Sequence, residues 1–192
     1  MVSRVIRLVS FTAVMLALVL LSAPLAFGTH INDQDGRTNL RTWRMAPSFP
    51  SAWDTALSNG ATMWDNVLNQ CHDFQQITST GEHTLLYKVD NYDGKFGVFA
   101  LTWANHAGIA FDGAEVWHAN VNSSPPINAL DLWSVAGHEL GHVLSLKHSG
   151  NFGVFPNYPT MANNYDYGQS YARSLEAYDR SHEQNLYPPG SC

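Results

Sequence analysis

Two histidines four residues apart, His138 and His142, constrain this chain more strongly than any other feature of its sequence. The stretch around them carries apolar residues at positions that fall near one face of a helix: Leu132, Val135, Leu140 and Val143. Residues four apart on a helix lie on one face, one turn above each other, so the two imidazoles point at the same place. Glu139 lies beside that place without occupying it.

This H-E-x-x-H arrangement binds zinc through two neutral imidazoles and supplies the glutamate as general base toward a metal-bound water. His148 completes three nitrogen ligands if the helix ends between it and His142. Three protein ligands leave the fourth position of the metal open, which distinguishes a catalytic zinc site from a structural one. The residues therefore predict one catalytic Zn²⁺ held by His138, His142 and His148, with Glu139 as the catalytic base. The alternative is a helix that carries two histidines without a ligand.

The stretch resembles the signature of the metzincin zinc metalloproteases, H-E-x-x-H-x-x-G-x-x-H followed by a methionine-containing turn. Ser149, directly after the third histidine, makes a minimal bacterial-type matrixin the nearest likeness, and Met161 matches the methionine of the turn. The resemblance implies an α+β (mixed α/β) catalytic domain. Such a domain has a twisted mixed sheet of about five strands with an antiparallel edge strand, two long helices and a C-terminal helix.

Ser145 departs from the signature, because it stands where the family has glycine. That glycine lets the chain leave the helix with a positive φ, which costs a residue with a Cβ about 1 kcal/mol or more. Two alternatives remain open from the sequence: the turn is built differently, or the site carries strain.

The first 28 residues have the order of a secretory signal peptide. Arg4 and Arg7 precede an apolar run over 8–21, and small residues follow up to Gly28. We expect cleavage after Gly28, with Ala26 as the second choice, and a secreted, extracellular protein without stable membrane association. The alternative is an uncleaved anchor, since the apolar segment approaches the length that spans a bilayer.

The mature chain, 29–192, has the size and composition of one folded domain. The apolar content of the sequence is 45 % and its charged content 14 %, which is typical of globular proteins. The net charge of the full sequence, −6, argues against nucleic acid or an anionic membrane as a partner. We expect a monomer, and Cys71 and Cys192 could form a disulfide in an oxidising compartment.

Apolar patterns predict strands over 38–45, 84–89, 97–104 and 116–121. Helical spacing predicts a helix from Ser51, as its N-cap, to about Gln70, and a closing helix over 170–186. One face of the closing helix carries its apolar and aromatic residues: Tyr171, Leu175, Tyr178, His182 and Leu186. By resemblance, 29–149 is an upper subdomain with the zinc helix, and 150–192 a lower subdomain with the methionine turn and the C-terminal helix.

The resemblance also implies substrate-binding residues. The segment 97–103 matches the matrixin edge strand that lies along the substrate cleft, where an extended peptide adds through main-chain hydrogen bonds. Tyr165 matches the wall of the pocket that follows the scissile bond. The substrate-binding residues expected on this basis are Val98, Phe99, Ala100, Leu101 and Tyr165.

A second metal is a weaker expectation. The segment 110–117 resembles the family's Phe-Asp-x-x-Glu-x-Trp, in which the residues matching Asp112 and Glu115 bind calcium. Ala110 stands where vertebrate matrixins have a ligand of a structural zinc, so a second zinc is not expected. Two carboxylates alone are too few for a Ca²⁺ site, and a solvated acidic surface is the alternative.

Together these features favour a secreted zinc-dependent endopeptidase that hydrolyses peptide bonds of a peptide or protein substrate by glutamate-assisted attack of a zinc-bound water. A catalytically weak, protease-like module that binds peptide or protein is one alternative, and Ser145 keeps it open. A zinc hydrolase of a non-peptide substrate is the other, because the ligand set permits it.

Overall fold

The computed structural model describes residues 41–47, 49–67, 74–78, 84–103, 108–150, 157–163 and 165–188. The predicted signal peptide, 1–28, and the predicted disulfide partners Cys71 and Cys192 lie outside the described residues, so both stay predictions. Among the described residues, no helix is both long and apolar enough to cross a bilayer.

A five-stranded mixed sheet forms one layer of the structure, in the order β2-β1-β3-β5-β4. Its strands are β1 (Arg41–Met45), β2 (Phe74–Gln76), β3 (Thr84–Asp90), β4 (Ala100–Thr102) and β5 (Gly108–Asp112). The pairs β1–β2, β1–β3 and β3–β5 are parallel, whereas β4 pairs antiparallel with β5 at the edge of the sheet. The predicted mixed α+β architecture with an antiparallel edge strand is therefore confirmed.

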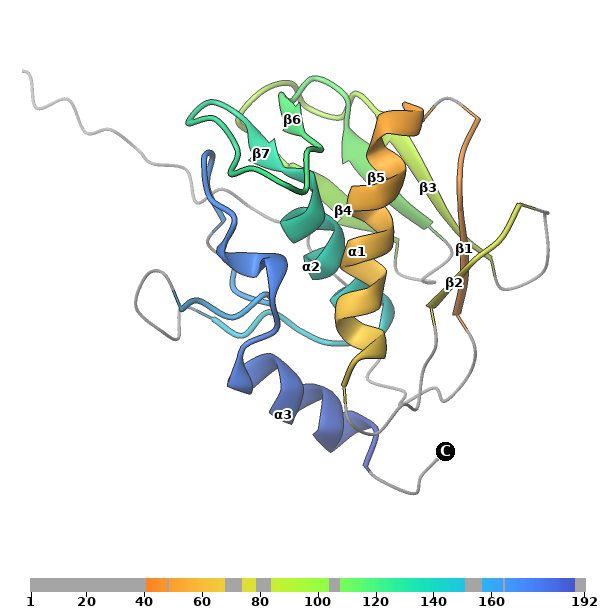
Figure 1. Cartoon of the computed structure of the whole chain (residues 1–192), viewed down its shortest axis with the longest axis vertical. Coiled ribbons are helices and arrows are strands. Elements are labelled where there is room, and N and C mark those ends of the chain that lie inside the picture. The colour runs from red at the N-terminus through yellow and green to blue at the C-terminus, as the bar shows by residue number, and fades with distance from the viewer. Residues whose placement is uncertain are drawn as a thin grey trace, which may run out of the picture.

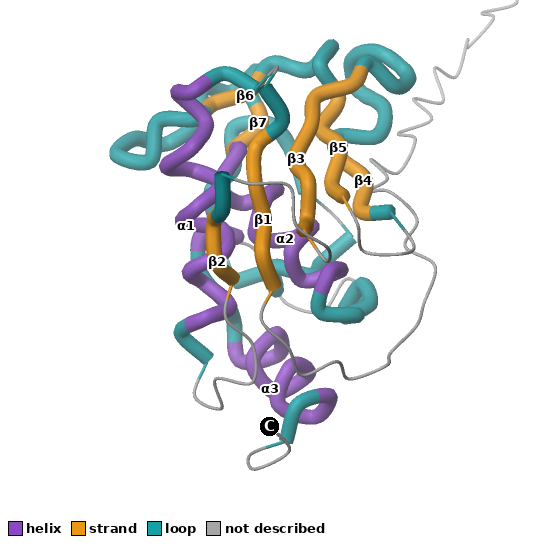
Figure 2. Tube along the Cα trace, turned by 90° about the vertical axis from the view of Figure 1, so that its right-hand side faces the viewer, coloured by secondary structure: helices purple, strands orange, loops and turns teal. Residues whose placement is uncertain are grey.

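Helices α1 (Asp54–Asp65) and α2 (Leu132–Val143) lie against each other behind the sheet (Figure 2). Gly60 permits their close approach, because a Cβ there would lie 2.9 Å from the backbone nitrogen of Gly137. The indole Nε1 of Trp64 also donates a hydrogen bond to the Gly137 carbonyl oxygen at 2.8 Å. Helix α3 (Ala177–Leu186) lies below these layers, near the C-terminus (Figure 1).

The first helix differs from its prediction at both ends. Ser51 is not an N-cap: it begins a 3₁₀ turn, Ser51–Trp53, in which the amide of Trp53 bonds to the carbonyl of Pro50 at 3.0 Å and no side chain caps the turn. The α-helix then ends at Asp65, not near Gln70. The Asp65 carboxylate accepts a hydrogen bond from the amide of Phe74 at 2.8 Å, which ties the end of α1 to β2.

The predicted strand over 97–104 contracts to β4, Ala100–Thr102. The segment before it forms a loop, because the amide of Val98 donates to the Asp93 carboxylate and Phe96 adopts a φ of 69°. The predicted strand over 116–121 contracts to β6 (Trp117–His118), which pairs with β7 (Leu130–Asp131) in a separate two-stranded sheet.

The predicted closing helix is interrupted, and the residues of its apolar face are buried unevenly: Leu175 is buried, whereas Tyr178 is exposed. A 3₁₀ turn, Tyr171–Arg173, precedes α3, which begins with a capping box between Glu176 and Asp179. The buried residues of α3 are the polar Asp179 and Glu183, whereas Tyr178 is exposed. Long-range hydrogen bonds to Asp179 determine this orientation, and apolar spacing within the helix does not report them.

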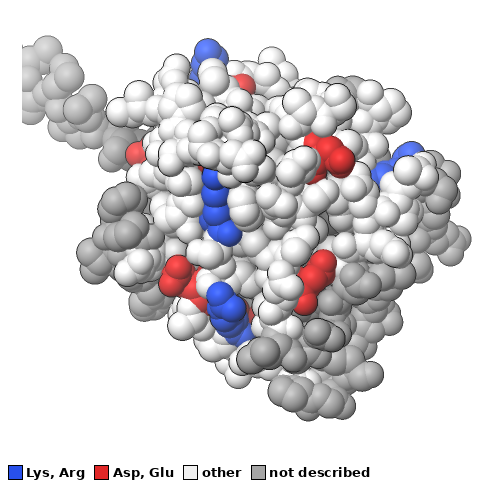
Figure 3. Space-filling model, viewed as in Figure 1, with Lys and Arg blue, Asp and Glu red and all other residues white. Residues whose placement is uncertain are grey.

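The charged side chains are sparse on the face shown in Figure 3, where a few Lys and Arg and a few Asp and Glu residues are scattered over a mostly uncharged surface. This distribution agrees with the low charged content of the sequence, 14 %.

Candidate active site

The three predicted zinc ligands converge at the C-terminal end of α2. Nε2 of His148 lies 3.2 Å from Nε2 of His138 and 3.2 Å from Nε2 of His142. Their ligand atoms all fall within 4.8 Å of one another, and they form the one group of three or more metal-ligating side chains found among the described residues. Imidazole nitrogens of this number and spacing fit a zinc ion with an open coordination position.

Asp131 fixes where α2 begins. Its carboxylate caps the helix by accepting hydrogen bonds from the amide and the hydroxyl of Ser134, at 3.0 and 2.7 Å. The same carboxylate forms a two-point ion pair with Arg173, with Nε at 2.9 Å and Nη2 at 2.6 Å. An aspartate N-cap stabilises a helix by about 1 kcal/mol, and the arginine joins this helix start to the segment after the methionine turn.

Ser145 ends the helix with a φ of 66°, so the second of the two sequence alternatives, a strained residue at the site, is the correct one. Its amide bonds to the carbonyl of His142 at 2.9 Å, and the amide of Leu146 bonds to the carbonyl of Gly141 at 3.0 Å. These two bonds define a Schellman motif, which usually places glycine at the left-handed position. The turn therefore keeps the family's geometry with a serine and delivers His148 to the site.

Backbone carbonyls orient two of the imidazoles. Nδ1 of His138 lies 2.7 Å from the carbonyl oxygen of Thr160, and Nδ1 of His142 lies 2.8 Å from that of Leu146. A carbonyl can only accept, so Nδ1 carries the proton on each ring and Nε2 presents its lone pair. Burial and the neighbouring His142 and His148 also lower the pKa of His138 well below its usual value, which keeps it in the neutral, metal-binding form.

Met161 packs beneath the histidine helix. It is buried, and a Cβ on Gly141 would lie 2.2 Å from its sulfur, so only glycine fits at that position of α2. The amide of Ser149 donates to the carbonyl of Met161 at 2.8 Å, which joins the methionine turn to the residue after His148.

Asp179 of α3 holds the same turn from the other side. Its carboxylate accepts hydrogen bonds from the amides of Thr160 and Met161, at 2.8 and 3.0 Å. Since the Thr160 carbonyl bonds to His138, one residue connects α3 to the first zinc ligand. Burial raises the pKa of Asp179, and its bonds to backbone amides oppose that rise.

The predicted base, Glu139, lies on α2 beside the histidines and is fully buried. Its Oε2 accepts a hydrogen bond from the hydroxyl of Thr102 at 2.7 Å. Burial raises the pKa of Glu139 to about 7, and the bonds to Thr102 limit the rise.

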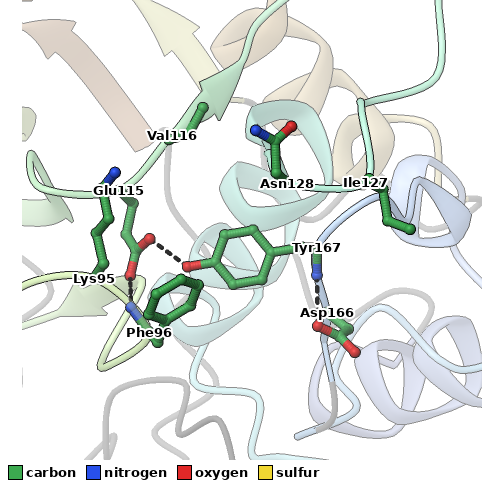
Figure 4. Close-up of a pocket in the computed structure, with 8 residues that line it drawn as sticks. All are labelled: Lys95, Phe96, Glu115, Val116, Ile127, Asn128, Asp166 and Tyr167. Carbon is green, nitrogen blue, oxygen red and sulfur yellow. Dashed lines mark hydrogen bonds between the residues drawn. The ribbon is translucent and has the colours of Figure 1, made fainter.

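Asp112 and Glu115 lie in a different place and engage protein donors. Glu115 accepts hydrogen bonds from the amide of Phe96 and from the hydroxyl of Tyr167 (Figure 4). Asp112 accepts from the amide of Ala114 at 2.7 Å. These two carboxylates belong to no group of three metal-ligating side chains within the described ranges, so calcium stays a prediction.

The expected substrate-binding residues differ in their exposure. Phe99 and Ala100 are buried, whereas Val98 and Leu101 are half-buried. Ala100 and Leu101 belong to β4, the edge strand of the sheet. Tyr165 is buried, and its hydroxyl donates to the carbonyl of Gln169. Its side chain therefore packs in the interior and bonds to the chain four residues further on, and its role in substrate binding stays a prediction.

Three residues of the site were missed from the sequence: Thr102, Thr160 and Asp179. Thr102 had a visible signal, because it is a hydroxyl within the apolar run 98–103. Thr160 contributes its backbone carbonyl, and Asp179 bonds to residues 18 or more positions away in the chain. Neither role can therefore be recognised from the neighbouring sequence.

The fold and the site define a class of protein: an α+β domain of the metzincin kind, with three histidines at one zinc position and a glutamate beside them. Within this class the sequence model of the Matrixin family of peptidases matches residues 45–188, and the chain belongs to that family.

Relatives with this likeness come from plants and animals. Metalloendoproteinase 1 of Glycine max is 32 % identical over 140 residues, which are 66 % of this chain and 45 % of that protein. Matrix metalloproteinase-20 of Homo sapiens is 29 % identical over 169 residues, 80 % of this chain and 32 % of that protein. Matrix metalloproteinase-26 of Homo sapiens is 28 % identical over 173 residues, 72 % of this chain and 64 % of that protein. The chain thus spans less than half the length of the first two.

Proposed function

We propose that this protein is a zinc-dependent endopeptidase that hydrolyses internal bonds of peptides or proteins. The observation that carries the proposal is the convergence of three imidazole Nε2 atoms beside the buried carboxylate of Glu139, in a chain of the Matrixin family. His138, His142 and His148 would hold the metal, and their neutral form and spacing suit zinc.

Bound zinc would supply a Lewis acid that activates water and polarises the scissile carbonyl. Glu139 takes the proton of the attacking water and passes it to the leaving amine. In the protein without metal, burial raises the pKa of this carboxylate to about 7. No side chain of the site acts as a nucleophile in this scheme, so no acyl-enzyme forms.

The peptide would add to the free edge of β4 as an extra strand. Support comes from the position of β4 at the sheet edge, with β5 on its other side. The segment of Val98, Phe99, Ala100 and Leu101 would lie along the peptide, with the backbone of β4 pairing with it, and the chain around Tyr165 would form the wall of the adjacent pocket.

The remaining expectations enter the proposal with their own tests. Residues 1–28 act as a signal peptide and 29–192 form the secreted, monomeric catalytic domain, which N-terminal sequencing and sedimentation of the exported protein would check. Cys71 and Cys192 form a disulfide, which the mass before and after reduction reports.

Calcium at Asp112 and Glu115 rests on the resemblance of the segment 110–117 alone. A rise in melting temperature with Ca²⁺ that Glu115→Gln abolishes would support it.

The test of the function is cleavage of a peptide library derived from whole proteins, with new termini identified by mass spectrometry. Chelator-sensitive cuts at internal peptide bonds are the expected result. Peptides that are retained on the immobilised protein but not cut would favour the binding module. If peptides are neither cut nor retained, the result would favour a zinc hydrolase that acts on a non-peptide substrate at the same site.

A further inference from the structure

A hydroxyl of the edge strand contacts the proposed base of the zinc helix. We propose that Thr102 is a positioning residue that holds the carboxylate of Glu139 in its working orientation, and this inference rests on the proposed function of the site. The two residues are 37 positions apart in the sequence and meet because β4 packs against α2.

The hydroxyl of Thr102 lies between two acceptors of the same residue. Its Oγ1 is 2.7 Å from the side-chain Oε2 of Glu139 and 3.0 Å from the backbone carbonyl oxygen of Glu139. A donor shared between these atoms ties the carboxylate to its own backbone and so restricts the side-chain dihedrals between them. The shorter contact is the one to the carboxylate, as expected for a charge-assisted hydrogen bond.

Burial makes this contact consequential. Thr102 is 3 % exposed and Glu139 is 0 % exposed, so bulk water does not compete for the carboxylate oxygen. A buried hydrogen bond that loses its donor leaves an unsatisfied acceptor, and the cost is larger for a charged group than for a neutral one.

The two carboxylate oxygens of Glu139 are not equivalent. Oε2 accepts from Thr102, whereas Oε1 is buried and accepts no hydrogen bond from the described part of the chain. Holding Oε2 fixes where Oε1 points. Oε1 is then the atom that takes the proton in the proposed reaction, and Thr102 keeps it free for that role.

The strand that carries Thr102 is also the proposed substrate edge. In β4 the side chains of Ala100 and Thr102 are buried and that of Leu101 is half-buried, so the strand alternates between the interior and its outer face. Thr102 pairs with Ile109 of β5 at the register that fixes this alternation. One short strand therefore presents backbone for the peptide and a hydroxyl for the base, which couples substrate position to base position.

The first test compares Thr102→Val, which removes the hydroxyl at nearly constant shape, with Thr102→Ser, which keeps it. We expect Thr102→Val to lower kcat roughly 10- to 100-fold, the scale of a misplaced catalytic group, while KM and the zinc content stay near wild type. Thr102→Ser should restore most of the lost rate. Thr62→Val is the matched control, because Thr62 is an exposed threonine of α1 whose hydroxyl bonds to Ser58. Wild-type kcat in Thr102→Val would overturn the inference.

The second test reads the contact without turnover, in metal-free protein. Thr102→Val should lower the melting temperature by roughly 3–8 °C when Glu139 is present. In a Glu139→Met background the same substitution should lower it by less than half as much, because the carboxylate is gone. Equal losses in both backgrounds would overturn the inference by assigning Thr102 to general packing. If Thr102→Val does not fold, Thr102→Ala replaces it in both tests.

The two proposals can fail separately. A wild-type protein that cuts no peptide but shows the coupling between positions 102 and 139 would refute the endopeptidase function and leave the positioning contact standing. A wild-type protein that cuts peptide, with Thr102→Val equally active, would refute the positioning role alone.

Discussion

Asp179 holds Met161 in place beneath the zinc site, because its carboxylate accepts a hydrogen bond from the backbone amide of Met161 at 3.0 Å. Asp179 belongs to α3, which lies outside the sheet layers (Figure 1). The other carboxylate oxygen accepts a hydrogen bond from the amide of Thr160, and the carbonyl of Thr160 orients the imidazole of His138. The C-terminal helix therefore contributes to metal geometry although it carries no ligand.

Asp179→Asn should destabilise the protein and weaken zinc binding. An asparagine has one acceptor oxygen in place of two, so one buried amide of the turn loses its partner, at a cost of about 1–3 kcal/mol. Urea unfolding and zinc competition with a chromophoric chelator measure both effects. Ser181→Ala, at an exposed position of the same helix, should change stability by less than about 0.5 kcal/mol. Unchanged zinc affinity in Asp179→Asn would contradict the link.

Gly141→Ala should be severely destabilising. Its Cβ would lie 2.2 Å from the Met161 sulfur and 2.8 Å from the Trp64 ring, so the methionine or the helix must move. Overpacking of this kind costs about 1–3 kcal/mol or more. Gly137→Ala is the matched substitution on the same helix. Its Cβ would meet the end of the Met63 side chain at 3.0 Å, and that end can shift, so a smaller loss is expected in thermal unfolding. Equal losses would be inconsistent with the packing described.

Ser145→Gly should stabilise the protein by about 0.5–1 kcal/mol. A residue with a Cβ is destabilised by roughly 1–2 kcal/mol at the positive φ of this turn. Glycine removes that strain, but its greater conformational freedom in the unfolded state offsets part of the gain. Ser145→Ala keeps the Cβ and should give no such gain. Chemical denaturation of the three proteins decides the matter, and a Ser145→Gly protein less stable than wild type would count against strain at this position.

Zinc removal should lower the melting temperature, and zinc should restore it. A ligand that binds the folded state alone stabilises it by about 4 kcal/mol at a thousandfold excess over Kd. His142→Ala should lose this response, whereas His182→Ala, at a half-buried position of α3 outside the histidine cluster, should keep it. Calorimetry with and without chelator provides the comparison. A full zinc response in His142→Ala would exclude it as a ligand.

The sequence predicted the zinc site well because its evidence is local. The four-residue spacing of His138 and His142 places both rings on one face of any helix that forms, and the position of His148 requires only that the helix end. The way it ends was not predictable, since the Schellman bonds that support a serine at positive φ belong to the backbone.

The rest depends on contacts between distant segments. Apolar and aromatic spacing in the last helix gave no sign that Asp179 and Glu183 are buried. Asp179 is buried where it accepts hydrogen bonds from amides of the methionine turn. The edge strand is shorter than predicted for a similar reason. The amide of Val98 donates a hydrogen bond to the Asp93 carboxylate, so Val98 does not pair with a neighbouring strand.

Whether the protein is a zinc endopeptidase with Glu139 as its base is tested by two measurements on wild type and Glu139→Ala side by side: the zinc content per chain and the cleavage of a quenched peptide. We expect one zinc per chain in both proteins and chelator-sensitive cleavage in wild type only. Cleavage by Glu139→Ala would contradict the role of the base, and a wild-type protein that binds no zinc would contradict the site itself.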